Sequence, residues 1–334
     1  MHERLHEDEA FGPPAVSTGR LPAPETVTAL VAEAQRRFAP VAEGTVADYI
    51  PALAKASADW FGISLCGVGG QVFSVGDAER PFSIQSISKP FVFALVCQAL
   101  GGGRARAAIG VNATGLPFNS VMAIELNAGH TMNPMVNAGA IATTSLAPGA
   151  TAKERWRFIR DGLSRFAGRE LELDNEVYAS EAATNQRNQG IARLLQGYGR
   201  MYCDPDEATD IYTRQCALNV TARDLAVMGA TLADGGVNPV TKERVVDADR
   251  CKRALAAMAT AGLYEESGDW LYEVGLPGKS GVAGGLVTIA PGKGGLGTFS
   301  PPLDAAGNSV RGQLVTQFLS ERLGLNLFAS APEA

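Results

Sequence analysis

The chain has 334 residues, of which 46% are hydrophobic and 19% are charged, and its formal net charge is −6 at pH 7. This composition is typical of an ordered globular chain that is long enough to bury a large core without disulfides or metal ions. The mildly acidic balance, without a run of basic residues, argues against a nucleic-acid partner. The longest apolar run covers only residues 90–100. A membrane-spanning helix needs about 20 apolar residues, so we expect no membrane partner.

The cysteines and the first residues of the chain predict its compartment. The five cysteines are scattered, odd in number and without a C-x-x-C pair, which fits neither a disulfide framework nor a zinc ribbon. The first ten residues are acidic and lack the apolar segment of a signal peptide. We therefore expect reduced thiols and a cytoplasmic location.

The first hundred residues predict an arm, a helix, a hairpin and a second helix. Charges and prolines in residues 1–24 predict a flexible N-terminal arm. Apolar residues at spacings of three and four then predict a helix over 25–38. Two short β-type runs, 62–66 and 71–75, flank a Gly-Gly turn and predict a hairpin. Residues 82–100 begin with polar side chains and continue as a buried helix.

The rest of the chain alternates loops, helices and glycine-punctuated strands. Residues 101–218 are loop-rich at first and then helical, with the clearest helices at 153–166 and 184–198. Thr221 is a suitable N-cap for a helix over 221–232, which the glycines after Asp234 end. Further helices are predicted at 248–261 and 310–323, and strands at 271–274, 284–290 and 297–300.

This order of elements predicts the fold class and the place of a site. Strands occur near both ends of the chain and helices dominate its middle. We therefore expect an α+β fold, with a sheet lobe made from about residues 25–100 and 219–330 and an inserted helical lobe at about 101–218. Ligands tend to bind where such lobes meet.

The histidines limit the chemistry that the chain can carry. His2 and His6 lie in the predicted arm, which leaves His130 alone in the folded part. A three-histidine metal site is therefore excluded there, and a Ser-His-Asp triad has a single possible base. We interpret His130 as a surface histidine in a loop without a role. Hydrolytic or acyl-transfer chemistry would use lysine, tyrosine or glutamate as its base.

The strongest local motif is S-x-x-K, formed by Ser86 and Lys89. At this spacing the two side chains share one helix face. Pro90 lacks an N–H, so Ser86 must lie at or near the helix start, where free N–H groups and the helix dipole favour a developing oxyanion. Burial by the apolar run that follows would lower the pKa of Lys89 and let it accept the serine proton. The simpler interpretation is a capping serine at a surface helix, because S-x-x-K is common by chance.

A second motif, K-S-G, occurs far downstream at residues 279–281 and is followed by V-A-G-G. K-[ST]-G after S-x-x-K is the pairing of penicillin-recognising serine enzymes. The simpler interpretation is a glycine-rich strand at a sheet edge. No convincing S-D-N element is present, which departs from the β-lactamase pattern.

Residues 292–297 match G-x-G-x-x-G literally, as a dinucleotide site would. The residues that follow include Pro301 and Pro302, which cannot open a helix. No helix N-terminus would therefore meet a pyrophosphate. We interpret the segment as a turn between strands and not as a nucleotide site.

Several longer segments match those of a known family in the same order. The chain resembles the serine-dependent glutaminases, whose fold is related to that of the β-lactamases. The resemblance covers about residues 25–328. It rests on VADYIP at 46–51, QSISKP at 85–90, NPMVNAGA at 133–140, Ser180-Glu181 with Asn188, GLPGKSGVAGG at 275–285 and SPPLD at 300–304.

The resemblance implies a fold and a set of roles. The fold would be β-lactamase-like, with an antiparallel sheet flanked by helices, in one glutaminase domain over residues 25–330. Ser86 would be the nucleophile and Lys89 its base, while Tyr264 would help to move protons and Tyr49 would line the site. The backbone N–H groups of Ser86 and Val282 would form the oxyanion hole. The implied substrate-binding residues are Gln85, Ser86, Asn137, Glu181, Asn188, Tyr212, Tyr264 and Val282.

Taken one at a time, these residues have simpler interpretations. Lys279 fits either a group that orients its neighbours or a lysine at a sheet edge. Only the match of these residues to the motif positions of the family favours the functional interpretation of the whole set. The simpler ones are helix caps for Asn137 and Asn188, a solvated surface carboxylate for Glu181, and half-buried core positions for Tyr212 and Tyr264.

Together these observations predict a glutaminase that converts L-glutamine to L-glutamate and ammonia. The amide would be cleaved through a Ser86 acyl-enzyme with Lys89 as base, without a metal or organic cofactor. The resemblance also implies a homodimer or homotetramer. The nearest alternative is a related serine acylase of the β-lactamase or peptidase type, which the missing S-D-N disfavours. An inactive scaffold that binds an amino acid is the alternative from another class, and the intact Ser86, Lys89 and Tyr264 argue against it.

Overall fold

The computed structural model describes residues 19–330. Helix α1 (Pro24–Phe38) occupies the first predicted helical segment, and its apolar residues at spacings of three and four are buried. Most of the predicted arm, residues 1–18, lies outside the described residues. The boundary between arm and domain stays a prediction.

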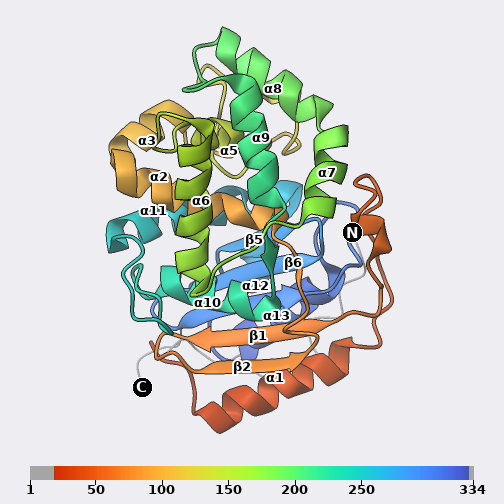
Figure 1. Cartoon of the computed structure of the whole chain (residues 1–334). Helices are drawn as coiled ribbons and strands as arrows, with labels where there is room; N and C mark the ends of the chain where they lie inside the picture. The colour runs from red at the N-terminus through yellow and green to blue at the C-terminus, as the bar shows by residue number, and fades with distance from the viewer. Residues whose placement is uncertain (1–18, 331–334) are drawn as a thin grey trace.

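The centre of the molecule is a five-stranded antiparallel sheet in the order β2-β1-β7-β6-β5. Strand β1 comes from the start of the chain and pairs with β7 from its end, with Leu65 opposite Leu296. Figure 1 shows these orange and blue strands side by side. The predicted antiparallel sheet and the hairpin near residue 70 are therefore confirmed. The strands are β1 (Gly62–Gly67), β2 (Val72–Gly76), β5 (Gly278–Gly281), β6 (Gly285–Ala290) and β7 (Gly294–Phe299). A separate pair joins β3 (Phe82–Ser83) to β4 (Asn219–Val220).

Helices cover both faces of the sheet. Helix α10 (Ala222–Ala233) packs on β1, β6 and β7, and its predicted start is confirmed because Thr221 and Asp224 form a capping box. Helices α1 and α13 (Val310–Arg322) pack together on the opposite face. The α+β class with a helix-flanked antiparallel sheet is thus confirmed.

Most of the remaining helices gather on the side of the sheet opposite α1 (Figure 1). Helix α2 (Ser88–Leu100) is buried from Ser88 to Cys97. The helices predicted at 153–166, 184–198 and 248–261 are confirmed as α6 (Ala152–Ala167), α8 (Gln186–Gly197) and α11 (Ala248–Ala261). Five helices were not predicted: α3 (Gly102–Ile109), α4 (Val121–Leu126), α5 (Asn137–Ser145), α7 (Asn175–Thr184) and α9 (Pro205–Cys216).

Two sequence predictions in the last hundred residues were wrong. Residues 271–274 belong to helix α12 (Ser267–Val274) and not to a strand. Trp270 and Val274 are four residues apart and bury the same face, so the helical period was present but the window was too short. The G-x-G-x-x-G segment is also only partly a turn, because Gly294 to Gly297 lie within β7.

The glycines of β7 have a packing role. A Cβ on Gly295 would lie 2.3 Å from the backbone nitrogen of Ala230 in α10. This clash is between backbone and backbone, so β7 and α10 would have to move apart to relieve it. We expect Gly295→Ala to lower the free energy of unfolding by about 3 kcal/mol through overpacking. Gly190→Ala, in helix α8 with open space around the new Cβ, should instead raise it by about 0.5 kcal/mol or more. Urea unfolding of both variants measures this, and equal stability of the two would contradict the packing argument.

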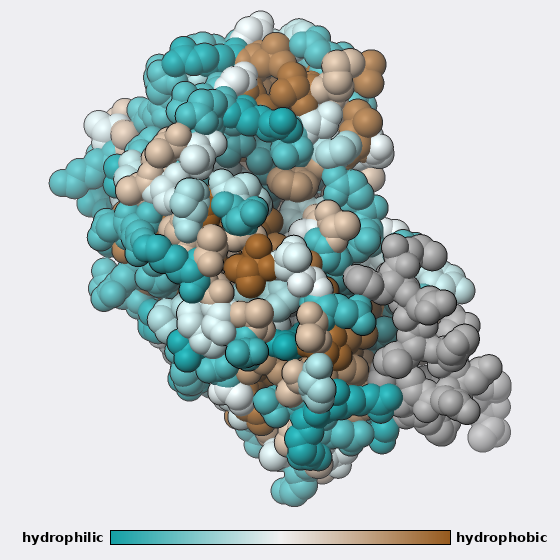
Figure 2. All heavy atoms as spheres, turned by 90° about the vertical axis from the view of Figure 1, so that its right-hand side faces the viewer, coloured by the Kyte–Doolittle hydropathy of each residue, from teal (hydrophilic) through white to brown (hydrophobic). Residues whose placement is uncertain are grey.

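Among residues 19–330, no helix is both long enough and apolar enough to cross a membrane. On the face drawn in Figure 2, hydrophobic residues form separate small patches among hydrophilic ones.

Candidate active site

Ser86 lies in a short 3₁₀ turn, η2 (Gln85–Ile87), directly before helix α2. Its side chain opens into a cavity although the residue is only 9% exposed. Gln85 has a φ of 51°, a left-handed conformation that is unusual for a residue other than glycine and that marks local strain. The prediction that Ser86 lies near a helix start is confirmed.

Lys89 is buried one turn further on, with 1% of its surface exposed. Its amine donates hydrogen bonds to Asn137 Oδ1 at 2.7 Å and to the carbonyl of Met135 at 3.2 Å. Burial lowers the pKa of Lys89 to about 8. A neutral amine has two N–H donors and one lone pair. Because the two carbonyl oxygens take both donors, the lone pair is left free to accept a proton.

Two buried tyrosines flank Ser86. Burial raises the pKa of Tyr212 and of Tyr264, and the neighbouring Ser86 side chain offsets only part of this rise. Both side chains therefore stay protonated phenols at neutral pH. Tyr264 donates its hydroxyl hydrogen bond to the carbonyl of Ser280 at 3.2 Å. The two were predicted as half-buried or functional, and both are more than nine-tenths buried.

Glu181 brings a buried carboxylate to the same cavity. It lies in helix α7 and is 7% exposed, so it is not a solvated surface group. Gln85 Nε2 donates to Glu181 Oε2 at 3.4 Å. Burial raises the pKa of Glu181 to about 7, while this hydrogen bond and the nearby Lys89 oppose the rise. Such a carboxylate is suited to a cationic group of a ligand.

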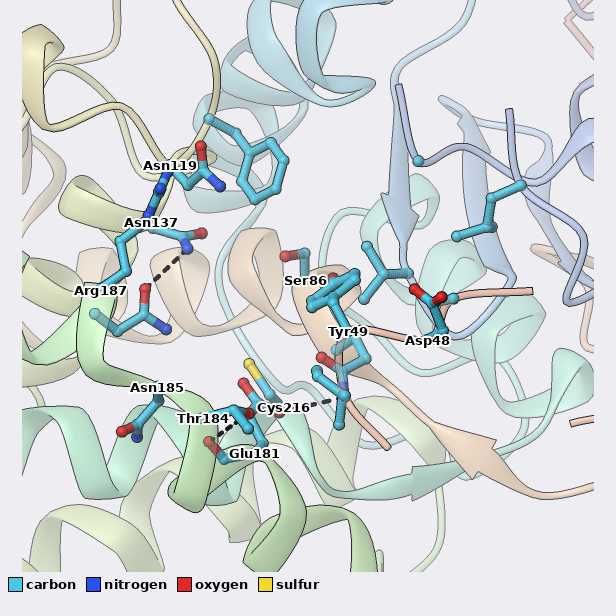
Figure 3. Close-up of a pocket in the computed structure, with 18 of the residues that line it drawn as sticks. Asp48, Tyr49, Ser86, Asn119, Asn137, Glu181, Thr184, Asn185, Arg187 and Cys216 are labelled. Carbon is cyan, nitrogen blue, oxygen red and sulfur yellow. Dashed lines mark hydrogen bonds between the residues drawn. The ribbon is translucent and has the colours of Figure 1, made fainter. Parts of the chain in front are cut away.

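Asn137 and Asn188 connect the lysine to the helical side of the site. Asn137 is the first residue of α5, and its side chain accepts from Lys89 and donates to Asn188 Oδ1 at 3.0 Å. Asn188 lies in the first turn of α8. Neither side chain caps its own helix, which corrects the simpler interpretation. Figure 3 shows Asn137 and Arg187 on one side of Ser86 and Tyr49 on the other.

Strand β5 lies directly against the Ser86 turn because Gly281 has no side chain. A Cβ there would lie 3.0 Å from Ile87 Cγ1 and 3.1 Å from the carbonyl of Ile84. This close approach brings Val282, the next residue, to the cavity wall. The glycine of K-S-G is therefore needed for the position of β5 relative to Ser86.

These groups line a cavity of about 500 Å³. Tyr49 lies at its margin and is 58% exposed. Arg187 is the only lining residue with a full positive charge among those that the structure describes. Of the predicted site residues, the cavity is lined by Tyr49, Gln85, Ser86, Asn137, Glu181, Asn188, Tyr212 and Val282, whereas Lys89 and Tyr264 lie just behind this lining.

Some lining residues were not predicted as site residues. Phe118 was missed because its loop has no local motif, yet its ring lies 4.6 Å from that of Tyr264. Arg187 and Cys216 give no sequence signal for a site, and burial keeps the pKa of Cys216 well above its usual value. The missed lining residues include Phe118, Asn119, Thr184, Asn185, Arg187, Cys216, Ala305, Ala306 and Gly307.

His130 does not take part in this site. It lies in a loop as predicted but is half-buried, since its ring stacks on Tyr198 with centroids 3.8 Å apart. Its Nδ1 also contacts the carbonyl of Ile124 at 2.7 Å. The histidine has a packing role, which corrects the expectation of a simple surface residue.

Comparison with known proteins places the chain in a family. The family model "Glutaminase" matches residues 44–328. The chain is 64% identical over 317 residues to "Glutaminase 2" of Yersinia pestis, covering 95% of this chain and 93% of that protein.

Solved structures agree with this match. A probable glutaminase, ybaS, superposes with a TM-score of 0.91 at 45% identity and covers 92% of this chain and 100% of its own. The Bacillus subtilis glutaminase YbgJ, solved as a covalent complex with 5-oxo-L-norleucine formed from 6-diazo-5-oxo-L-norleucine, has a TM-score of 0.80 at 30% identity and covers 91% and 99%. The predicted β-lactamase-like fold is thereby confirmed. The chain belongs to the glutaminase family, hydrolases that act on the amide of glutamine.

Proposed function

We propose that this chain hydrolyses the side-chain amide of L-glutamine through an acyl-enzyme on Ser86, with Lys89 as the base. One observation carries this proposal: Ser86 lines the cavity, and the Lys89 amine, buried behind it, donates to two carbonyl oxygens. The covalent complex of the B. subtilis relative supports a nucleophilic side chain in this family.

The reaction has two stages. Ser86 Oγ attacks the amide carbon while its proton passes to the Lys89 lone pair, and the carbonyl oxygen becomes an oxyanion bound by the N–H groups of Ser86 and Val282. The C–N bond then breaks. Ammonia leaves after it receives the proton from Lys89, with Tyr264 as a donor on the route. A water molecule next gives one proton to Lys89 and attacks the γ-glutamyl ester, which releases glutamate and restores the Ser86 hydroxyl.

The cavity also supplies groups for the other end of the substrate. Glutamine carries an α-ammonium and an α-carboxylate besides its neutral carboxamide. Glu181 would bind the ammonium, and the amides of Asn137 and Asn188 with the Tyr212 phenol supply donors for the carboxylate. Gln85 holds the Glu181 carboxylate and Tyr49 closes the margin of the cavity.

The direct test is turnover by the purified full-length chain. Glutamate and ammonia should appear in equal amounts from L-glutamine, measured with glutamate dehydrogenase and by ammonia determination. L-Asparagine and a chromogenic β-lactam are run beside it. Hydrolysis of the β-lactam without glutamine turnover would favour the serine acylase alternative, and tight calorimetric glutamine binding without turnover would indicate a binding scaffold.

Glu181→Gln is expected to raise the KM for glutamine by about two orders of magnitude, because a buried ammonium would lose its counter-charge. A substrate analogue without the α-amino group should already have a similarly high KM with the unaltered enzyme. Glu181→Gln should change the KM for this analogue little. Steady-state kinetics with both substrates measure the coupling. Glu176→Gln, in the same helix but paired with Lys55 at the surface, is the control and should leave KM unchanged. Equal losses for both substrates in Glu181→Gln would contradict an ammonium site.

We further propose that the chain acts in the cytoplasm as a homodimer or homotetramer with one catalytic domain over residues 25–330. Light scattering coupled to size exclusion measures the subunit number. A variant lacking residues 1–24 tests whether the domain keeps its activity without the arm.

A further inference from the structure

A second lysine is buried beside the proposed reaction centre. Lys279 in β5 has no exposed surface, although β5 is an edge strand. The sheet edge is covered there by η2 and α11, which corrects the alternative of a sheet-edge lysine in solvent. Burial lowers the pKa of Lys279 well below its usual value, and the charge of Lys89 adds to this. Burial and the nearby charge of Lys89 thus both favour the neutral form of this amine.

The hydrogen bonds of Lys279 converge on the backbone around Tyr264. Its Nζ donates to the carbonyl of Gly262 at 2.9 Å and to the carbonyl of Ser280 at 2.9 Å. The Ser280 carbonyl is also the acceptor of the Tyr264 hydroxyl, at 3.2 Å. The Lys279 nitrogen lies 4.4 Å from the centroid of the Tyr264 ring. One amine thus contacts the turn that precedes the tyrosine, its ring and the acceptor of its hydroxyl.

Tyr264 needs such support because its backbone is strained. It has a φ of 56°, a left-handed conformation that costs a residue with a Cβ about 1–3 kcal/mol. The strained residue begins the short 3₁₀ turn η3 (Tyr264–Glu266) between α11 and α12. A strained conformation persists only where the surrounding structure fixes it, and the Lys279 bridge between Gly262 and Ser280 does this.

We propose that Lys279 is a positioning residue, whose amine bridges the carbonyls of Gly262 and Ser280 and thereby holds the Tyr264 phenol beside Ser86. This inference rests on the proposed function. The Lys279 amine donates to both of these carbonyls, and Lys279 is not among the residues that line the cavity. The lysine therefore acts through Tyr264 and not on the substrate.

A double-mutant cycle tests the proposal. Lys279→Met should lower kcat by about 100-fold, as expected for a misplaced catalytic group, and should change KM little. In a Tyr264→Phe background, Lys279→Met should lower kcat by a further factor of less than about three. The effects of two residues are not additive when one acts through the other. A full 100-fold loss in both backgrounds would overturn the proposal.

The pH profile separates positioning from an electrostatic role. If Lys279 acts only by positioning Tyr264, the methionine variant should keep the midpoint of kcat/KM near the pKa of Lys89, about 8. An upward shift of the midpoint would show that the charge of Lys279 acts on Lys89, and it would contradict the proposal. Should Lys279→Met fail to fold, Lys279→Gln keeps two N–H donors on a shorter side chain. It should retain more activity than Lys279→Ala, and equal activities would count against the bridge.

Lys293→Met is the matched control. Lys293 is also buried and also donates to a backbone carbonyl, that of Gly324 at 2.7 Å, but it does not line the cavity. This control should hydrolyse glutamine at the rate of the unaltered chain. If neither the unaltered chain nor Lys293→Met hydrolyses glutamine, the proposed function fails. If both do and Lys279→Met is equally active, only the inference about Lys279 fails.

Discussion

Ser86→Ala is expected to lower kcat for glutamine by about five orders of magnitude or more, because the variant has no oxygen to form the acyl-enzyme. The backbone N–H groups of the cavity wall remain, so glutamine should still bind. We also expect the variant to fold, since the larger buried side chains of η2, those of Gln85 and Ile87, are unchanged. Ammonia release measures the loss, and calorimetry with glutamine measures the retained binding.

Ser88→Ala is the control for this result. Ser88 lies two residues further along, and its hydroxyl donates to the carbonyl of Gln85 at 2.8 Å without reaching the cavity. Its loss should reduce stability by about 1 kcal/mol and leave turnover largely intact. Equal activity of Ser86→Ala and the unaltered chain would remove the nucleophile from the account.

Lys89→Met is expected to lower kcat by about 10²–10⁴-fold, the usual contribution of a positioned base. Methionine has nearly the same length and is apolar, so it fills the buried space with little change in packing. Asn137 loses its partner but keeps its hydrogen bond to Asn188. Turnover assays measure the loss, and retention of full activity would exclude Lys89 as the base.

The pH dependence of the unaltered chain follows from the same amine. Below the Lys89 pKa of about 8 the amine is protonated and cannot accept the Ser86 proton. Activity should therefore rise with pH and level off above about 8. Glu181 must be ionised to bind the ammonium, and its pKa of about 7 should make the loss of kcat/KM steeper below pH 7. A kcat/KM that is flat between pH 6 and about 9 would contradict both assignments.

Local chemistry made the centre of the site predictable. Pro90 predicted that Ser86 lies at or near a helix start without reference to the rest of the chain, and the apolar residues after it accounted for the burial of Lys89. The K-S-G motif likewise predicted a strand, and its glycine explains the close approach of β5 to Ile87. These inferences depended on neighbours within a few residues.

The features that the sequence did not predict depend on distant parts of the chain. Lys279 is buried because α11 and η2 cover an edge strand, and no pattern around residue 279 indicates that cover. Phe118 enters the cavity because its backbone N–H is bound by Glu265, 147 residues away. No sequence pattern near Tyr264 predicts its left-handed φ, since glycine is the usual residue in that conformation. Such features arise from tertiary packing and not from local propensity.

The most direct test of the account is covalent labelling with 6-diazo-5-oxo-L-norleucine, the reagent used on the B. subtilis relative. The protein is incubated with the reagent at pH 8 and digested, and the modified peptide is located by mass spectrometry. The account predicts label on Ser86, with glutamine protecting it and with Lys89→Met labelled far more slowly. Inactivation with the label on another residue, or with the Ser86 peptide unmodified, would contradict it.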